Sequence, residues 1–276
     1  MVVVALHQPV LERIGLASLD QVRSFQGALV KNHRGRRDVL RIETTDADDR
    51  PLVLFLKRNL LPYRKDGLAS LWRRGRVWSA ARVEFENGRC LLQHGIPAAR
   101  PVAFGESCGR LWERFSFVIT EAATGSETLD VFLRERADPD PRAKVLTGLA
   151  GLARRLHDAG LASPDLISRH VFLDRSSPEP GFCLIDMARL DQGRCIPHQR
   201  RARDLASLHV SIPESSASAR EREILLRTYC GQDLPFEQMQ EMIQKRVAHL
   251  LRQKRHRVPY FGLHLQPGFQ YKKYRY

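Results

Sequence analysis

Hydrophobic and polar residues in the first half of the chain alternate with the spacing of β-strands around one helix. A helical pattern fills residues 79–94 and ends at Gly95, a residue suited to a helix C-terminus. A turn-forming cluster separates the first two strands, which predicts a hairpin. Antiparallel strands with one helix predict a small α+β lobe. The strands are predicted at residues 38–45, 52–57, 101–105 and 115–120.

The second half of the chain changes to helical spacing after the small residues at 122–126. Asp140 before Pro141 predicts a helix start, and Gly160 predicts its end. Apolar residues at helical spacing lie between them. Two short strands and three further helices are predicted after it, at 171–174 and 182–186, and at 202–210, 217–229 and 236–252. This pattern divides the chain into two lobes, residues 1–122 and 123–276.

The composition is that of a globular protein without structural disulfides. The chain has 276 residues, of which 43% are hydrophobic, and its five cysteines are odd in number and show no paired spacing. This argues against a disulfide framework or a zinc site and favours a reducing compartment. The apolar run at the start is too short for a signal peptide, and no apolar stretch is long enough to cross a bilayer. We therefore expect a soluble protein.

The strongest compositional feature is the net charge of +14, with an isoelectric point near 10.1. Such a charge predicts an anionic partner, which can be nucleic acid, an acidic membrane surface or a phosphorylated substrate. Charge alone does not choose among these three.

Two carboxylates in the second half have the spacing that phosphoryl transfer requires. Asp165 lies on a loop after a helix, with the polar residue His170 five positions on, and Asp186 ends a predicted strand. In phosphoryl transfer one acid accepts the proton of the acceptor hydroxyl, and another holds magnesium against the nucleotide phosphates. A helix–loop–strand–turn–strand unit can bring the two acids together.

In the first half, Lys57 at the end of a strand and Glu84 on the following helix complete an ordered set. A strand lysine can reach nucleotide phosphates, and a helical glutamate can orient it as an ion pair. Each residue alone has a plain alternative, since lysines at strand ends and glutamates on helices are usually solvated.

The chain resembles the bacterial lipopolysaccharide core kinases, the heptose and Kdo kinases that are distantly related to protein kinases. The similarity extends from about Ser24 to Leu208 and is clearest in Ser24–Gly27, Glu84–Asn87, Gly95–Glu106, Phe117–Glu121, Leu156–Gly160, Ile185–Arg189 and Arg203–Leu208.

This resemblance implies a two-lobed protein-kinase-like fold of the α+β class, with a small antiparallel-sheet N-lobe and a mainly helical C-lobe. It implies that ATP and Mg²⁺ are used. Lys57 would hold the ATP phosphates and pair with Glu84, while Glu121 would begin the hinge beside the adenine. In the C-lobe, Asp165 would be the catalytic base, and Asp186 and His170 the metal ligands. Protein kinases have Asn at the position of His170, and the heptose-kinase branch resembles this chain in having His.

The sequence departs from the kinase pattern at the catalytic loop. Ser163 and Pro164 stand before Asp165 where the family has His-Arg or a close variant. A catalytically weak or inactive pseudokinase is therefore an alternative. No glycine-rich phosphate loop is visible, since only Gly27 and Gly35 flank the region. Asp204 either accepts backbone N–H bonds from the catalytic loop or is a plain acid near a helix N-terminus.

Two basic segments suggest which kind of substrate or surface the protein binds. One lies between Lys57 and Arg82, and the other is the basic and aromatic tail at 252–276. Both suit an anionic glycolipid or the membrane that carries it, or alternatively a solvated surface. Single-stranded nucleic acid would suit the same composition, but no RNA-binding signature accompanies it, so it ranks lower. The first segment contains Arg58, Arg64, Lys65, Arg73, Arg74 and Arg76, with Trp72 and Trp78.

The sequence as a whole predicts a cytoplasmic kinase, peripheral to the inner membrane, that phosphorylates a heptose of the lipopolysaccharide inner core. The alternatives are a pseudokinase and a module that binds an anionic membrane or nucleic acid.

Overall fold

The computed structural model describes residues 1–62, 75–125, 127–135, 138–174 and 180–261, with side chains up to residue 253. The chain forms two compact units, residues 1–123 and 124–276. Arg64, Lys65, Trp72, Arg73 and Arg74 of the first basic segment lie outside the described residues, as does most of the basic and aromatic tail.

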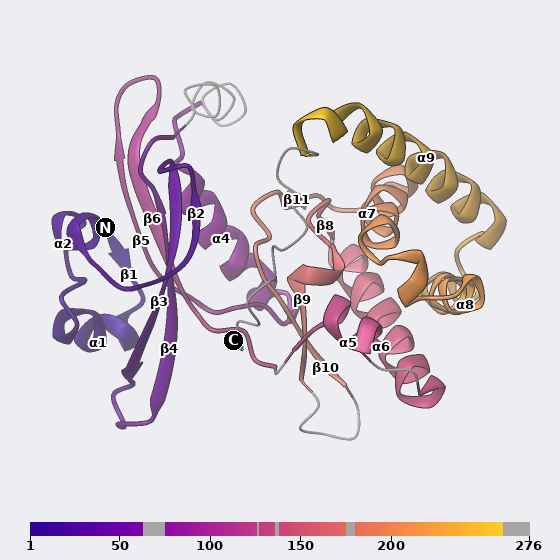
Figure 1. The fold of residues 1–276 in the computed structure, drawn as a ribbon, viewed down its shortest axis with the longest axis horizontal. Helices are drawn as coiled ribbons and strands as arrows, with labels where there is room; N and C mark the ends of the chain where they lie inside the picture. The colour runs from indigo at the N-terminus through magenta and orange to yellow at the C-terminus, as the bar shows by residue number, and fades with distance from the viewer. Residues whose placement is uncertain (63–74, 126, 136–137, 175–179, 262–276) are drawn as a thin grey trace. The chain divides into compact units, whose positions relative to one another are not determined.

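The N-terminal unit is built on a six-stranded antiparallel sheet in the order β1-β5-β6-β4-β3-β2 (Figure 1). The four predicted strands are present, and β4 continues two residues beyond Lys57. The strands are β1 Val2–Val3, β2 Ala28–His33, β3 Arg37–Thr45, β4 Pro51–Asn59, β5 Pro101–Cys108 and β6 Glu113–Glu121.

The predicted helix is α4, Ala80–Gln93, which begins where the Ser79 side chain accepts the Arg82 N–H. Two short helices, α1 Gln8–Arg13 and α2 Leu19–Ser24, follow the 3₁₀ turn η1 at Ala5–His7 and were not predicted. Six residues are too few to show a helical period, although Ser18 and Gln21 do form a capping box at α2.

Strand alternation places different helices on the two faces of this sheet. Leu54 and Leu56 of β4 are buried in a cluster with residues of α1 and α2. On the opposite face, Phe104 and Val118 pack with Phe85 of α4. Because side chains alternate along a strand, Lys57 lies on the α4 face, opposite to Leu56. The period of the strand therefore directs Lys57 toward the helix that carries Glu84.

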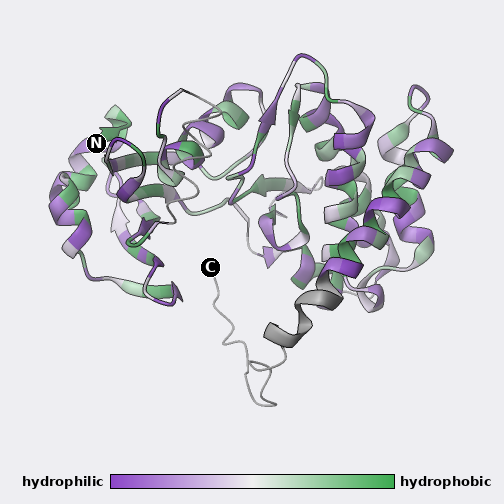
Figure 2. Cartoon of the chain, turned by 90° about the horizontal axis from the view of Figure 1, so that it is seen from above, coloured by the Kyte–Doolittle hydropathy of each residue, from purple (hydrophilic) through white to green (hydrophobic). Residues whose placement is uncertain are grey.

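The C-terminal unit is mainly helical, with two small antiparallel sheets in the orders β10-β9-β7 and β11-β8 (Figure 1). Hydrophobic and hydrophilic residues alternate around its helices, which is typical of helices that bury one face (Figure 2). Its helices are α5 Leu129–Glu135, α6 Pro139–Asp158, α7 His198–Ser211, α8 Ala219–Cys230 and α9 Phe236–Phe261, with 3₁₀ turns η2 Ser168–His170 and η3 Glu214–Ser216. Its strands are β7 Glu127–Thr128, β8 Leu161–Ala162, β9 Val171–Asp174, β10 Gly181–Leu184 and β11 Asp191–Gln192.

Helix α6 begins and ends at identifiable residues. Its N-cap is Asp138, whose side chain accepts the Asp140 N–H, so the predicted cap at Asp140 was two residues late. Gly160 follows its end with φ of 75°, and a Cβ there would lie 2.1 Å from the Gly193 carbonyl oxygen. Only glycine fits this position, which joins the helix to the strand that precedes the Asp165 loop.

Among the described residues, no helix is both long enough and apolar enough to span a membrane.

Candidate active site

Lys57 and Glu84 form an ion pair in the N-terminal unit. The distance from Lys57 Nζ to Glu84 Oε1 is 2.5 Å, and Glu84 is only 8% exposed. The second carboxylate oxygen, Oε2, accepts a hydrogen bond of 3.1 Å from Arg37 Nη2. Glu84 therefore orients two cations, of which only Lys57 was predicted.

Arg37 reaches Glu84 because of the tight hairpin between β2 and β3. Arg34 and Gly35 at its centre have φ of 51° and 69°, and the Arg36 N–H donates to the His33 carbonyl. This turn places Arg37 at the start of β3, next to β4. A glycine-rich loop was not visible in the sequence, and the tip of this hairpin carries arginines instead.

Glu121, the predicted hinge residue, ends β6. Its backbone N–H donates to the Arg100 carbonyl at 2.9 Å. Its side chain makes a 2.8 Å hydrogen bond with Nε2 of the buried His7 from the N-terminal turn. His7 therefore fixes the Glu121 side chain.

In the C-terminal unit, Asp204 of α7 anchors the loop that carries Asp165. Its Oδ2 accepts the backbone N–H of Ser163 at 2.5 Å, and its Oδ1 accepts Arg203 Nε at 2.8 Å. Asp204 is completely buried. Of the two predicted roles for Asp204, acceptance of a loop N–H bond is therefore the one that the structure confirms.

The residues around Ser163 perform some of the anchoring that a catalytic-loop histidine would provide. The Ser163 hydroxyl accepts the Asp165 N–H at 3.2 Å. His157 of α6 lies between Asp204 Oδ2, at 3.3 Å, and the Tyr229 hydroxyl, at 2.7 Å. Burial raises the pKa of Tyr229 to about 12, so its hydroxyl stays protonated. The Ser-Pro departure thus leaves the loop tied to the helical core.

Arg189, which follows Asp186 by three residues, binds the Asp165 carboxylate. The Arg189 Nε lies 3.0 Å from Oδ1 and 3.1 Å from Oδ2, and its backbone N–H donates to Oδ2 at 3.1 Å. Its Nη2 also bonds Oδ1. These bonds to Asp165 raise the pKa of Arg189 above its ordinary value. The spacing of residues in the sequence did not single out Arg189, although it ends Ile185–Arg189, one of the segments that resemble the kinase family.

Asp186 follows β10, and His170 ends the η2 turn immediately before β9, the strand that pairs with β10. Asp186 has φ of 57°, a left-handed conformation that is uncommon outside glycine and frequent at functional sites. His170 Nε2 lies 3.8 Å from Asp186 Oδ2, while His170 Nδ1 lies 3.0 Å from the Asp165 carbonyl oxygen. A carbonyl only accepts, so Nδ1 carries the proton and Nε2 presents a lone pair toward Asp186.

This pair fits a shared cation better than a direct bond. Burial lowers the pKa of His170 below its ordinary value, which favours the neutral imidazole. His170 Nε2 and Asp186 Oδ2 are then 3.8 Å apart, which is longer than a hydrogen bond. Among the described residues, no group of three or more His, Cys, Asp or Glu side chains is placed to hold a metal. Magnesium needs fewer protein ligands than that, since substrate phosphates and water complete its coordination.

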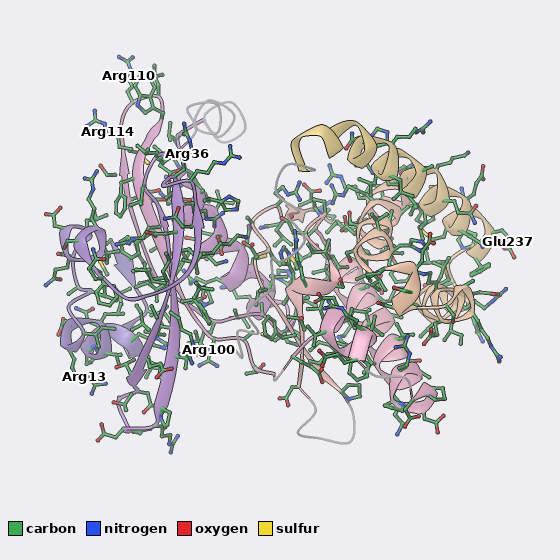
Figure 3. The ribbon with its side chains drawn as sticks, in the orientation of Figure 1. Arg13, Arg36, Arg100, Arg110, Arg114 and Glu237 are labelled. Carbon is green, nitrogen blue, oxygen red and sulfur yellow. The ribbon has the colours of Figure 1, made fainter. Side chains whose placement is uncertain are left out.

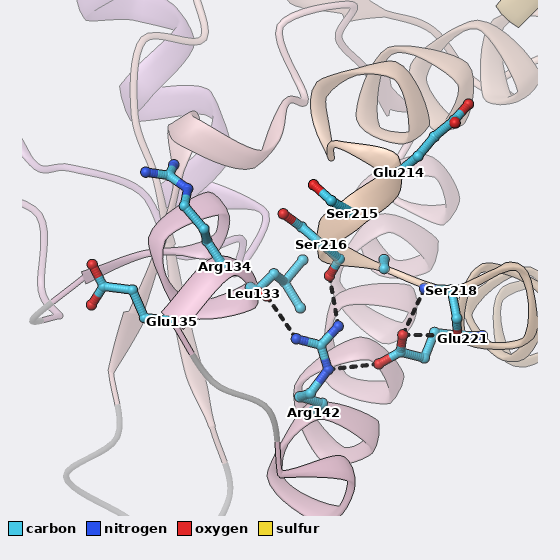
Figure 4. A pocket seen from close by; sticks show the side chains of 10 residues that line it. Leu133, Arg134, Glu135, Arg142, Glu214, Ser215, Ser216, Ser218 and Glu221 are labelled. Atoms are coloured by element: carbon cyan, nitrogen blue, oxygen red, sulfur yellow. Dashed lines mark hydrogen bonds and ion pairs between the residues drawn. The ribbon is translucent and has the colours of Figure 1, made fainter.

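A separate pocket of about 410 Å³ in the C-terminal unit surrounds Arg142 (Figure 4). The Arg142 guanidinium donates to the Leu133 and Ser216 carbonyls and to Glu221, at 2.7, 2.6 and 2.7 Å. Its donors are thus bound by protein, and we assign Arg142 a structural role.

The first basic segment is only partly a solvent-exposed surface, which corrects the prediction. Arg58 is buried and forms an ion pair with Asp38 at 2.7 Å. Arg76 and Arg82 stack on the Trp78 ring, at 5.1 and 4.4 Å from its centroid, and Arg82 also pairs with Glu106. The prediction was wrong for Arg58, because charge runs in sequence do not show which side chains a sheet buries.

An antiparallel sheet with a Lys–Glu pair, and a helical unit with a loop Asp and a strand-end Asp, define a protein-kinase-like phosphotransferase. The lipopolysaccharide kinase (Kdo/WaaP) family model matches residues 20–229. The chain belongs to this family, which confirms the resemblance and the kinase-like fold.

Individual relatives agree with this assignment. The chain is 27% identical over 233 residues to the lipopolysaccharide core heptose(I) kinase WaaP of Pseudomonas aeruginosa, covering 78% of this chain and 81% of the relative. It is 26% identical over 234 residues to the Escherichia coli enzyme of the same name, covering 78% and 82%. A solved structure of WaaP in complex with acyl carrier protein superposes with a TM-score of 0.65 at 25% identity, covering 92% of this chain and 98% of that chain.

Proposed function

We propose that this protein transfers the γ-phosphoryl group of ATP to a heptose hydroxyl of the lipopolysaccharide inner core. The observation that carries the proposal is the Lys57–Glu84 pair at 2.5 Å, between a central strand and the helix on its face. Such a pair holds the phosphates of the nucleotide in protein kinases. The relatives named as heptose(I) kinases supply the acceptor.

The reaction needs one proton acceptor and a stabilised leaving group. The acceptor oxygen forms a bond to the γ-phosphorus, and the bond from that phosphorus to the β,γ-bridging oxygen breaks. The electron pair of that bond leaves with ADP. The hydroxyl proton passes to the Asp165 carboxylate and from there to solvent. The Asp165 N–H donates to the Ser163 hydroxyl, and the Arg189 backbone N–H donates to Asp165 Oδ2, which holds Asp165 in place for this step.

The remaining predicted residues take supporting roles. Lys57, oriented by Glu84, neutralises the nucleotide phosphates, and Arg37 adds a second charge beside the same carboxylate. Glu121 begins the segment that receives the adenine. Asp186 and His170 would hold the magnesium ion, which would neutralise charge on the β- and γ-phosphates. The 3.8 Å separation of His170 Nε2 and Asp186 Oδ2 supports that assignment.

Phosphate transfer is tested by mass spectrometry of dephosphorylated core oligosaccharide incubated with the protein, ATP and magnesium. We expect one added phosphoryl group on a heptose, with none when ATP is omitted. A parallel thermal-shift measurement with magnesium and ATP separates the alternatives. Stabilisation without transfer would indicate a pseudokinase, and no stabilisation would contradict the kinase assignment altogether.

We further propose that the protein works in the cytoplasm at the anionic face of the inner membrane. Figure 3 shows Arg36, Arg110 and Arg114 at one end of the N-terminal sheet. Between the last two, Leu111 and Trp112 are exposed at the β5–β6 turn. Arginine suits anionic headgroups, and tryptophan and leucine suit the membrane interface.

Flotation with anionic and neutral liposomes tests the membrane contact. Binding should require anionic lipid, fall as salt is raised, and weaken when Leu111 and Trp112 are both changed to Ser. Salt-independent binding, or no binding, would contradict the membrane contact.

The solved relative in complex with acyl carrier protein suggests that carrier protein as another partner, which co-elution in size-exclusion chromatography would test.

A further inference from the structure

One residue supplies all the hydrogen bonds that the Asp165 carboxylate receives within the described part of the chain. Arg189 contributes its backbone N–H, Nε and Nη2, and Nε is shared between the two carboxylate oxygens. A carboxylate has about four lone-pair sites. Four contacts from Arg189 therefore leave little room for the proton of an acceptor hydroxyl. In this arrangement the carboxylate of Asp165 is held in place, but its acceptor sites are taken by Arg189.

The side-chain bonds are the ones that can be released. The Arg189 side chain is 68% exposed, whereas that of Asp165 is 13% exposed. The backbone N–H is fixed by the chain and would keep Arg189 beside Asp165 after the guanidinium has moved. An ion pair with one partner in water contributes little net free energy, so its exchange costs little.

Other arginines show what a purely structural role looks like here. The side chain of Arg58 is 7% exposed and donates to Asp38 and to three backbone carbonyls. That of Arg142 is 10% exposed and donates to two carbonyls and to Glu221. Both guanidinium groups are enclosed by protein acceptors, whereas Arg189 directs most of its surface to solvent and binds a single carboxylate.

A phosphoryl group would compete for this guanidinium. The acceptor hydroxyl must contact Asp165, so the phosphoryl group that it attacks arrives one bond further away. Guanidinium binds phosphoryl oxygens in the same two-pronged way as it binds carboxylates. The group in transfer carries charge on three equatorial oxygens, which a nearby cation stabilises.

We propose that Arg189 positions Asp165 in the resting enzyme and changes partner during the reaction, when it acts as a catalytic residue. In the resting enzyme its guanidinium holds the Asp165 carboxylate in place. When nucleotide and acceptor bind, the guanidinium moves to the transferring phosphoryl group, and the freed carboxylate oxygen accepts the hydroxyl proton. The inference rests on the proposed phosphotransfer and adds a residue and an exchange step to it.

The kinetic test compares Arg189→Met and Arg189→Lys with Arg200→Met, which removes an exposed arginine whose ion pair to Asp191 is long, at 3.9 Å. We expect Arg189→Met to lower kcat by roughly 10²-fold, the typical cost of losing one aligned charge-stabilising donor, with KM for ATP changed little. The kcat of Arg189→Lys should lie between those of Arg189→Met and the wild type. Added guanidinium ion, below denaturing concentrations, should restore part of the Arg189→Met activity, and Arg200→Met should match wild type.

A merely structural Arg189 would give a different result. Its loss would lower the melting temperature, and added guanidinium would not restore kcat. Unchanged kcat in Arg189→Met, or a loss of activity explained by unfolding in both Arg189 variants, would overturn the proposal.

An NMR measurement separates this inference from the choice of acceptor. The Nε–H signal of Arg189, assigned by its absence in Arg189→Lys, should shift in Asp165→Asn. It should also shift in the wild type when magnesium and a non-hydrolysable ATP analogue are added with core oligosaccharide. If the Nε–H signal shifts but no heptose is phosphorylated, heptose is not the acceptor, and the proposed exchange of Arg189 still holds. If the signal does not shift with these ligands although a heptose is phosphorylated, the exchange of Arg189 is wrong and the proposed phosphotransfer still holds.

Discussion

Glu84 in the N-terminal unit and Asp165 in the C-terminal unit are both carboxylates held by cations, but they are held in different ways. Glu84 is bound by two side chains, Lys57 and Arg37, which are 15% and 35% exposed. Asp165 is bound by Arg189, which is 68% exposed. A carboxylate that only orients a cation can be enclosed. A carboxylate that accepts a proton needs a partner that can leave.

The largest expected effect comes from Asp165→Asn. The amide keeps the size of the side chain but cannot take the hydroxyl proton, so kcat for transfer should fall by roughly 10²–10⁴-fold. Magnesium–ATP should still raise the melting temperature. Glu84→Gln is the matched carboxylate-to-amide control, with a smaller loss of kcat. An equal loss in both variants would remove the distinction between orienting and reacting carboxylates.

The second prediction compares the contributions of Lys57 and Arg37, the two cations that bind Glu84, to kcat/KM for ATP. Lys57→Met should lower kcat/KM for ATP by roughly 10²-fold, because it removes a charge aimed at the phosphates. Arg37→Gln should change it by less than about fivefold, since a partly exposed pair contributes up to ~1 kcal/mol. Steady-state kinetics at varied ATP concentration measure both. The reverse order would make Arg37 the main phosphate ligand.

Asp204→Asn tests whether the loop depends on its buried anchor. The substitution weakens the bonds to Ser163 N–H and Arg203, and should cost about 1–3 kcal/mol of unfolding free energy. Urea unfolding followed by circular dichroism measures this. Asp191→Asn is the control, because the Asp191 side chain pairs with Arg203 and Arg200, at 2.7 and 3.9 Å, and not with the Ser163 N–H. We expect Asp191→Asn to unfold within about 1 kcal/mol of wild type.

The smallest effect concerns Glu221, a carboxylate far from the proposed chemistry in sequence. Its hydrogen bond to Arg142 lowers the pKa of Glu221 from 4.5 to about 2. A depressed pKa contributes stability that is complete above pH 4.5 and is lost as the pH falls toward 2. The melting temperature of Glu221→Gln should therefore lie below that of wild type at pH 6, and the gap should narrow as the pH falls below 4.5. A constant gap would contradict the lowered pKa.

The sequence predicted those parts of the site that depend on periodicity and order. Lys57 and Glu84 were singled out because a strand and a long helix have clear periods, and their ion pair is present. Asp165, His170 and Asp186 were proposed because their order is typical of kinases. Arg37 and Arg189 were not assigned roles, because strand register and loop geometry bring them to their carboxylates. The burial of Arg58 opposite Asp38 was missed for the same reason, since the pairing of β3 with β4 sets it.

The position of Arg58 has a consequence for the order of folding. Its Nη1 donates to the carbonyls of Val22, Arg23 and Phe25 at the end of α2, at 3.1, 3.0 and 2.8 Å. A helix of six residues does not persist alone in water. Helix α2 is synthesised before Arg58, the residue that completes its C-terminus, which lies more than thirty positions further along the chain. We therefore expect α2 to become ordered only after the β3–β4 hairpin has formed.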